Sequence, residues 1–205
     1  MVNNFDKAAT WMYNMDEDEF FFIQVLVRGK DGHNANGNNT NRCIKYYTIR
    51  SFNEFEFARY EIKTLCDQFN ARAYIHYGKR SFEQIGKEML RTVTDRLISE
   101  NWQGMKSAFQ HCCGKCVLKK NKYYIVDVDW FDNEDQEDKD ARVLRYKNFI
   151  NFNCENIQDT NKVLEIIPTN NGCHLICKPF NINKFKTKFP DIDIKQDSPT
   201  LLYKA

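Results

Sequence analysis

The order of apolar and polar residues divides the first half of the chain into strands and amphipathic helices. Residues 20–28 and 42–51 are rich in β-branched and aromatic side chains and predict two strands separated by a polar loop. Ser51 and Ser81 each precede a Glu or Gln by three positions, which is typical of a helix N-terminus. A short strand is predicted between the helices, at 71–77. Apolar residues follow at helical spacing, and we expect them to face the core: Phe55, Ala58, Ile62, Leu65 and Phe69, then Phe82, Ile85, Met89, Val93 and Leu97.

From residue 117 onward the pattern takes a period of two, which is typical of strands. The tetrapeptide TNNG at 169–172 is a strong signal for a hairpin turn between two of these strands. The expected elements are strands at 123–130, 162–168, 173–180 and within 191–203, a helix at 141–152, and a short helix or loop at 181–189. Because hairpins and helices are mixed, we expect an α+β fold with helices packed on a mainly antiparallel sheet.

Length and composition favour one compact domain. The chain has 205 residues, of which 42% are hydrophobic, so it is long and apolar enough to build a core. We expect residues 1–205 to form a single compact domain, with an N-terminal α/β part at 1–114 and a strand-rich part at 115–205. No apolar run reaches about 18 residues, so no membrane span is expected. The N-terminus has no apolar signal segment, and we expect a cytoplasmic protein with reduced cysteines.

Net charge and cysteine spacing exclude few classes of function. The net charge of +2 points to no particular partner. The charge is uneven, with basic clusters at 115–122 and 184–188 and an acidic cluster at 132–140. Cys113 and Cys116 have the C-x-x-C spacing of half a zinc site, but no second pair with suitable spacing follows. The sequence therefore favours thiols beside a turn at Gly114 over a zinc site.

The segment YYIVDVDW places two carboxylates in an otherwise apolar strand. Strand alternation puts Asp127 and Asp129 on one face and Val126 and Val128 on the other. Their Cα atoms would be about 6.5–7 Å apart, so the carboxylates can converge on one divalent ion or bridge two. Oxygen ligands of this kind suit Mg²⁺ or Mn²⁺. The alternative is an ordinary half-exposed strand with a polar face.

Two further groups of residues in the second half carry candidate chemistry. His174 follows the predicted hairpin turn and shares a strand face with Lys178, which makes a candidate anion site or, alternatively, an ordinary polar surface. Asp191 and Asp193 repeat the Asp-x-Asp pattern near the end of the chain and are expected on one face of another strand. Asp197 precedes Ser-Pro, a context that favours a turn.

Taken in order, these motifs resemble those of the archaeo-eukaryotic primase superfamily, the primase-polymerase family. That family has an Asp-x-Asp motif in a hydrophobic strand, a histidine on a hairpin and a third aspartate on another strand. Here IVDVDW contains Asp127 and Asp129, PTNNGCHLI contains His174, and DIDIKQD offers Asp193 as the first choice for the third acid. The resemblance covers residues 123–203 and implies an RRM-like antiparallel sheet as the catalytic core.

The resemblance implies a template-dependent nucleotidyltransferase, such as a DNA primase, that joins nucleotides by two-metal phosphoryl transfer. Its catalytic, metal-binding residues would be Asp127, Asp129 and Asp193, which would hold Mg²⁺ or Mn²⁺. His174 and Lys178 would bind the nucleotide phosphates. The implied partners are nucleoside triphosphates and a single-stranded DNA template, with a replicative helicase as a further candidate.

Basic residues of the first half are further candidates for contact with nucleotide or template phosphates. Arg72 and His76 share a face of the strand predicted at 71–77, and Lys79 and Arg80 follow it. The alternative for all of them is ordinary surface polarity.

Two other classes of function stay open at this point. Clustered aspartates with a histidine serve hydrolysis equally well, so a metal-dependent nuclease is one alternative. A non-catalytic, primase-like protein that binds nucleic acid or a nucleotide is the other. Gly172 stands where the family has a small hydroxyl residue two positions before the histidine, and the chain is short for such a catalytic unit. The sequence does not distinguish an RNA product from a DNA product.

Overall fold

The computed structural model describes residues 1–29, 41–118, 122–153 and 161–205, which form two compact units. Unit 1 contains Asn3–Asn121 and Leu201–Ala205, and unit 2 contains Lys122–Thr200. Each unit has a sheet with antiparallel strand pairs and helices packed against it, which confirms the α+β class. Most of the predicted polar loop, residues 30–40, lies outside the described residues.

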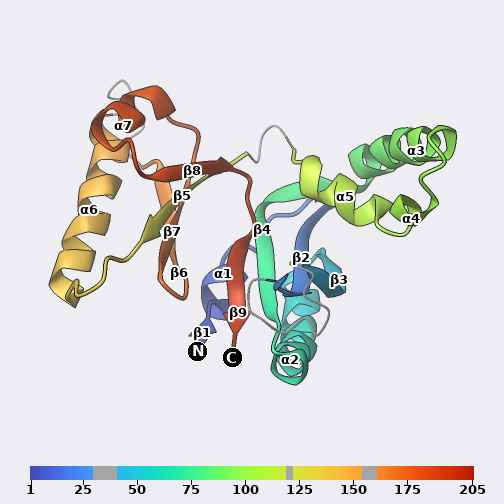
Figure 1. Ribbon diagram of the computed structural model, residues 1–205, viewed down its shortest axis with the longest axis horizontal. Helices are drawn as coiled ribbons and strands as arrows, with labels where there is room; N and C mark the ends of the chain where they lie inside the picture. The colour runs from blue at the N-terminus through green and yellow to red at the C-terminus, as the bar shows by residue number, and fades with distance from the viewer. Residues whose placement is uncertain (30–40, 119–121, 154–160) are drawn as a thin grey trace. The chain divides into compact units, whose positions relative to one another are not determined.

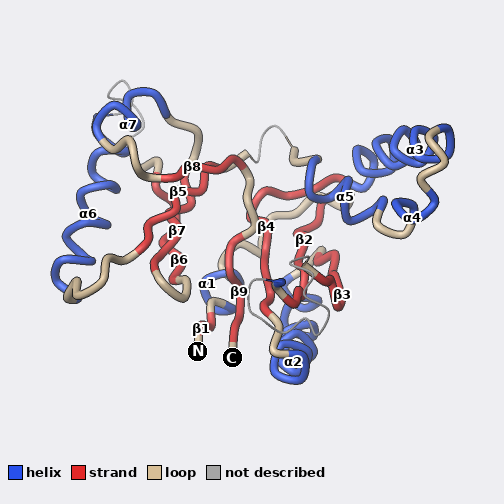
Figure 2. Tube along the Cα trace, viewed as in Figure 1, coloured by secondary structure: helices blue, strands red, loops and turns tan. Residues whose placement is uncertain are grey.

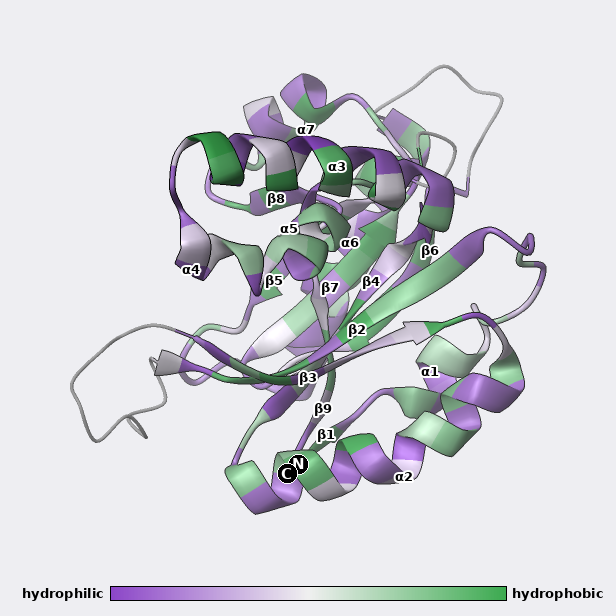
Figure 3. Ribbon diagram, turned by 90° about the vertical axis from the view of Figure 1, so that its right-hand side faces the viewer, coloured by the Kyte–Doolittle hydropathy of each residue, from purple (hydrophilic) through white to green (hydrophobic). Residues whose placement is uncertain are grey.

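The sheet of unit 1 is built around an apolar interior strand. In spatial order its strands are β1 (Val2–Asn3), β9 (Thr200–Lys204), β4 (Arg72–Ser81), β2 (Glu19–Val27) and β3 (Arg42–Ile49) (Figure 1). β2 pairs antiparallel with both β3 and β4, so the predicted hairpin of the first two long strands is confirmed. Figure 3 shows β2 as hydrophobic over most of its length, as expected of a strand buried by neighbours on both sides.

The helices of unit 1 are α1 (Phe5–Ala9), α2 (Phe52–Phe69), α3 (Phe82–Ile98), α4 (Trp102–Met105) and α5 (Ala108–Lys115). α2 contacts β2, β3 and β4, whereas α3 packs chiefly against α5 (Figure 1). Phe20 and Phe22 of β2 join Ile85 of α3 and Cys112 of α5 in one buried cluster. This cluster fixes the helical pair onto the sheet.

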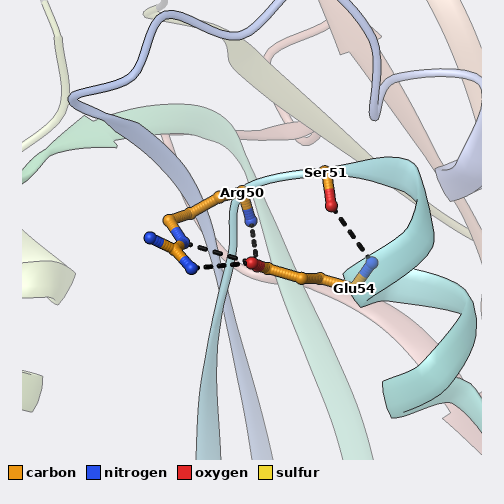
Figure 4. Close-up of polar contacts among 3 residues, drawn as sticks. All are labelled: Arg50, Ser51 and Glu54. Atoms are coloured by element: carbon orange, nitrogen blue, oxygen red, sulfur yellow. Dashed lines mark hydrogen bonds and ion pairs between the residues drawn. The ribbon is translucent and has the colours of Figure 1, made fainter.

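The first predicted capping motif begins α2. The Ser51 hydroxyl accepts a hydrogen bond from the Glu54 N–H at 3.2 Å (Figure 4). The Glu54 carboxylate reaches back to the N–H of Arg50 at 2.8 Å and also pairs with the Arg50 guanidinium at 2.9 Å. The predicted helix start is confirmed, with the returning bond made one residue earlier than in the standard capping box.

The second predicted cap, at α3, is completed from outside the motif. The Ser81 hydroxyl accepts from the Gln84 N–H at 3.2 Å and donates to the Asp18 carboxylate. The other oxygen of Asp18 accepts from the Glu83 N–H at 3.0 Å. A residue 63 positions away in sequence therefore supplies part of the cap, which local pattern alone does not reveal.

Three expectations for unit 1 were wrong. The first is that Phe69, at the end of the apolar stripe of α2, faces the core, since its side chain is exposed.

The other two concern α3 and α5. Of the predicted apolar stripe of α3, only Ile85 is buried, while Phe82 and Leu97 are exposed, because α3 lies against α5 instead of along a sheet. Gly114 is not at a turn, since it lies inside α5. The neighbouring thiols are nevertheless free, and burial raises the pKa of Cys113 to about 12.

Unit 2 is a four-stranded antiparallel sheet with two helices. Its elements are β5 (Tyr124–Asp129), α6 (Gln136–Asn153), β6 (Val163–Pro168), β7 (Gly172–Cys177), α7 (Ile182–Lys188) and β8 (Asp193–Gln196) (Figure 2). The spatial order of the strands is β6-β7-β5-β8, and each neighbouring pair is antiparallel. The hairpin predicted at TNNG is confirmed as the connection between β6 and β7.

One face of the unit 2 sheet carries the core. Val126 and Val128 of β5 pack with Leu175 of β7 and with aromatic residues of α6 and α7, among them Tyr146 and Phe185. Asp127 is excluded from this cluster because successive strand residues point to opposite faces. The predicted alternation along β5 is therefore confirmed, and the carboxylates lie on the face opposite the helices.

Among the residues that the structure describes, no helix is long and apolar enough to cross a membrane.

Candidate active site

Three of the predicted site residues stand in one row across neighbouring strands of unit 2. Asp127 of β5 is directly opposite His174 of β7 on one side and Asp193 of β8 on the other. Residues directly opposite each other in antiparallel strands have Cα atoms about 4.5–5.5 Å apart and side chains on the same face. Segments separated by as many as 66 positions in sequence are thus brought together by pairing register alone.

The histidine is hydrogen-bonded through both ring nitrogens. His174 Nε2 lies 3.2 Å from Asp127 Oδ1, and His174 Nδ1 lies 3.2 Å from the Thr200 hydroxyl. Thr200 is buried. With Nε2 donating to the carboxylate, the ring orientation is fixed from both ends, so His174 is a positioned group instead of a free surface histidine.

Lys195 is a member of this site that sequence reasoning missed. Its ammonium lies 3.1 Å from Asp127 Oδ2 and 3.0 Å from Asp193 Oδ2, so it bridges the two carboxylates. The signal was present, because Lys195 lies two residues after Asp193 and therefore on the same strand face. The sequence does not show how β8 is aligned with β5, and only that alignment reveals which residues of β8 lie near Asp127.

The electrostatics of the row centre on Asp127. The hydrogen bond from His174 lowers the pKa of Asp127 to about 2, and Lys195 adds to the effect against the opposing influence of partial burial. Partial burial lowers the pKa of Lys195, but its bonds to Asp193 and Asp127 outweigh this, so the pKa is raised. Asp127 is therefore a carboxylate, and Lys195 an ammonium, over the whole physiological pH range.

Gly172 permits the close strand pairing on which this row depends. A Cβ at position 172 would lie 1.9 Å from the Val128 carbonyl oxygen, a backbone atom. Gly172 is opposite Asp129 in the register, two residues before His174. Glycine is required at this position for a steric reason, since any side chain here would push β7 away from β5.

The other aspartates that the sequence suggested for the site differ in where they lie relative to this row. Asp129 lies at the exposed end of β5, on the same face as Asp127. Asp191 precedes β8 and sits in a turn, so the expectation that it shares a strand face with Asp193 was wrong. Asp197 follows β8 with a positive φ of 51°. Of the three acids considered for the third position, Asp193 is the one in register with Asp127.

Lys178, which was predicted to bind phosphate together with His174, lies outside this row. It follows the end of β7, and its backbone N–H donates to the Lys162 carbonyl at 2.8 Å. At about 3.3 Å per residue, it is some 13 Å beyond His174 along the strand direction.

The basic residues predicted on the strand at 71–77 belong to unit 1. Arg80 is fully buried, and its guanidinium donates to the Cys113 carbonyl at 2.7 Å and to the Gly78 carbonyl. It also lies 3.0 Å from Nδ1 of His76, which is buried as well. Both residues, like Arg72, lie on β4, where Arg80 ties α5 to the sheet. A role for these residues toward phosphate stays a prediction.

The oxygen donors of the row suit a hard divalent cation. Asp127 and Asp193 already share one cationic atom, the Lys195 ammonium, and Asp129 stands on the same face. Carboxylate oxygens are the type of ligand that Mg²⁺ or Mn²⁺ takes in proteins. Within the described ranges, no group of three or more His, Cys, Asp or Glu side chains is gathered closely enough to form a ready metal site.

Comparison with known proteins adds no relative. No protein-family model matches the sequence, and no curated protein or solved structure is significantly similar to it.

Proposed function

We propose that the chain is a primase-polymerase-like nucleotidyltransferase that extends a nucleic acid on a single-stranded template. The observation that carries this proposal is the row of Asp127, His174 and Asp193 in register across three adjacent strands. Three motifs identified separately in the sequence lie opposite one another in the pairing register, on one face of the sheet. This proximity supports the proposal, because residues that act on one substrate must lie close together.

The topology of unit 2 supports an RRM-like catalytic core. Its elements follow the order β-α-β-β-α-β, which is that of the split β-α-β, or ferredoxin-like, motif. The sheet has four strands with both helices packed on one face, and the row of Asp127, His174 and Asp193 lies on the other. RRM domains also place their nucleic-acid contacts on a four-stranded sheet.

The roles of the residues follow from the chemistry of phosphoryl transfer. Asp127, Asp129 and Asp193 would hold Mg²⁺ or Mn²⁺. The bound metal would neutralise negative charge on the triphosphate and activate the attacking 3′-hydroxyl. His174 orients Asp127 through its hydrogen bond. Its contact with the nucleotide phosphates is part of the proposal. The partners in this proposal are nucleoside triphosphates and single-stranded DNA, and a replicative helicase and a cytoplasmic location remain predictions.

Incorporation of labelled nucleotides on a single-stranded template, with Mg²⁺ or Mn²⁺, tests the proposal. We expect Asp127→Asn to lower the rate by at least about 100-fold, because charge stabilisation by a metal site contributes several kcal/mol. Asp191→Asn is the matched control, since it removes the same charge from an exposed turn outside the row, and it should retain the wild-type rate. Equal rates for wild type and Asp127→Asn would refute the assigned site.

The bonds of Asp127 favour one alternative, a non-catalytic nucleotide-binding protein. Both carboxylate oxygens of Asp127 have protein partners, His174 on one and Lys195 on the other. A protein of this kind would bind nucleotides equally well in EDTA and would incorporate none. If the reaction without nucleotides instead shortens the DNA or RNA, the same acids serve a nuclease.

A further inference from the structure

Lys195 occupies the position between two carboxylates that a divalent cation would take. Its ammonium is 3.1 Å from Asp127 and 3.0 Å from Asp193, and both acids are assigned above to metal binding. Two neighbouring carboxylates repel each other unless a cation lies between them. In the absence of metal, that cation is Lys195.

We propose that Lys195 is a tethered counter-cation that competes with divalent metal for the carboxylates and moves to the substrate triphosphate when metal binds. This inference rests on the proposed function and adds a regulatory residue to the same site. The lysine keeps the acids together and charge-balanced while the site awaits its substrate. Metal without nucleotide is then bound weakly, because it must displace an ammonium that has no other anion to join.

The position of Lys195 in the fold allows it to move. β8 is the edge strand of the four-stranded sheet, so Lys195 has a strand neighbour on one side only. Its side chain is 45% exposed, and four rotatable bonds let a lysine swing without moving the backbone. Asp127 is held on its other oxygen by His174, so the carboxylate stays in place when the ammonium leaves.

The nature of the side chain supports a transient contact. An ammonium is a compact, strongly hydrated charge. An arginine would instead form bidentate hydrogen bonds with the carboxylates through its planar guanidinium and would be harder to displace. Lysines that contact the β- and γ-phosphates are a recurring feature of phosphoryl-transfer sites. A displaced Lys195 ammonium near the bound metals would meet the triphosphate as the nearest new anion.

Binding of Mn²⁺ in the absence of nucleotide, measured by electron paramagnetic resonance, tests the competition. We expect Lys195→Gln to bind Mn²⁺ about threefold to tenfold more tightly than wild type, the range for removing two partly exposed ion pairs. Lys184→Gln is the matched control, because Lys184 lies on α7 and its loss changes the net charge equally. In the incorporation assay, Lys195→Gln should raise the KM for nucleotide, since the triphosphate loses a cation.

The outcomes separate the inference from the proposed function. If wild type, Lys195→Gln and Lys184→Gln bind Mn²⁺ equally tightly, Lys195 does not compete and the inference is overturned, while the metal site stands. If none of the three proteins binds Mn²⁺, both the inference and the proposed metal site are overturned. Tighter binding by both variants would reflect net charge and would also overturn the inference.

A metal-free measurement checks the bridge itself. In EDTA, Lys195→Gln should lower the Tm, because Asp127 and Asp193 are left to repel each other. Adding Asp193→Asn to Lys195→Gln should recover part of the loss, whereas Asp193→Asn alone should lower the Tm by removing one ion pair. Strict additivity of the two substitutions would contradict a bridge between the carboxylates.

Discussion

Asp127 is the residue on which the chemistry of unit 2 converges. Its two oxygens are bound by His174 and Lys195, and it faces Asp193 across the strand. A carboxylate placed in an apolar strand would be costly if it were unpaired. Here the cost is offset by a donor and a cation, and the same partners hold the group in the ionised form that a metal requires.

The low pKa of Asp127 predicts a specific acid sensitivity of the metal-free protein. Because the folded-state pKa is about 2 and the usual value is 3.8, the unfolded chain takes up this proton first as the pH falls. The stabilisation is therefore present above about pH 4 and is lost between about pH 4 and pH 2. Urea unfolding in EDTA should show the free energy of unfolding falling over this range, with roughly 2 kcal/mol due to Asp127.

Asp127→Asn should flatten this part of the profile, because an amide does not titrate. Asp191→Asn removes an exposed carboxylate from a turn and should leave the slope of wild type. An unchanged slope in Asp127→Asn would contradict the assigned contacts.

Gly172→Ala should be strongly destabilising. The new Cβ would lie 1.9 Å from the Val128 carbonyl, so two paired strands must separate to admit it. We expect a loss of about 3 kcal/mol or more, at the upper end for overpacking. Chemical denaturation measures it, and the Asp127–His174 register should be disturbed with it.

Gly86→Ala is the control, and it should stabilise the protein where Gly172→Ala destabilises it. Gly86 lies in α3 with no atom within 4 Å of a Cβ, so alanine should stabilise the helix by up to about 1 kcal/mol. Similar destabilisation by both substitutions would mean that the tight approach at Gly172 is not the cause.

At the scale of elements, local sequence determines where helices begin, and tertiary contacts determine what they pack against. Ser51 and Ser81 begin α2 and α3 as their motifs predict. The apolar stripe of α2 is buried at Phe55 and Ile62 and ends at the exposed Phe69. In the stripe of α3 only Ile85 is fully buried, and Met89 is half-buried against the same cluster. The two patterns look alike in sequence, because periodicity reports a face and not the partner of that face.

Ser81→Ala should destabilise the protein by about 1 kcal/mol or more. The substitution removes both the acceptor for the Gln84 N–H and the donor to Asp18, which itself caps the Glu83 N–H. N-cap serines replaced by alanine typically cost about 1 kcal/mol. Thermal unfolding followed by circular dichroism measures the effect.

Ser107→Ala is the control for this cap. Ser107 is the N-cap of α5, but its side chain makes no capping hydrogen bond and is exposed. Its replacement should stay within about 0.5 kcal/mol of wild type. Equal losses for the two serines would contradict a special role of the Asp18–Ser81 pair.

At the scale of the whole molecule, the last strand belongs to the first unit. β9 lies between β1 and β4 in the sheet of unit 1, although unit 2 separates it in sequence from the rest of that sheet. Leu201, Leu202 and Tyr203 are buried, and the Leu202 carbonyl accepts from the Asn4 N–H at 2.9 Å. The strands β1 and β9, which are farthest apart in sequence, therefore lie side by side in the sheet of unit 1.

Deletion of Leu201–Ala205 should open unit 1 selectively. The deletion removes three buried side chains and an interior strand, so amides of β4 should lose protection from hydrogen exchange, while amides of β5 in unit 2 should keep theirs. Removing only Lys204 and Ala205 should leave both units protected. Equal loss of protection in β4 and β5 would show that the two units unfold as one.

Local sequence was enough to predict most of the elements and the faces of β5, but not the position of Asp191. Alternation of side chains placed Asp127 opposite the core, and turn chemistry predicted the hairpin that carries His174, since both depend only on neighbouring residues. Tertiary structure alone decided the register. It placed Asp193, and neither Asp191 nor Asp197, opposite Asp127, and it brought Lys195 to the same row. It also required glycine at 172 and enclosed Arg80 in the core of unit 1. The physical reason is that strand pairing joins residues distant in sequence, and a shift of one position would turn every side chain to the other face.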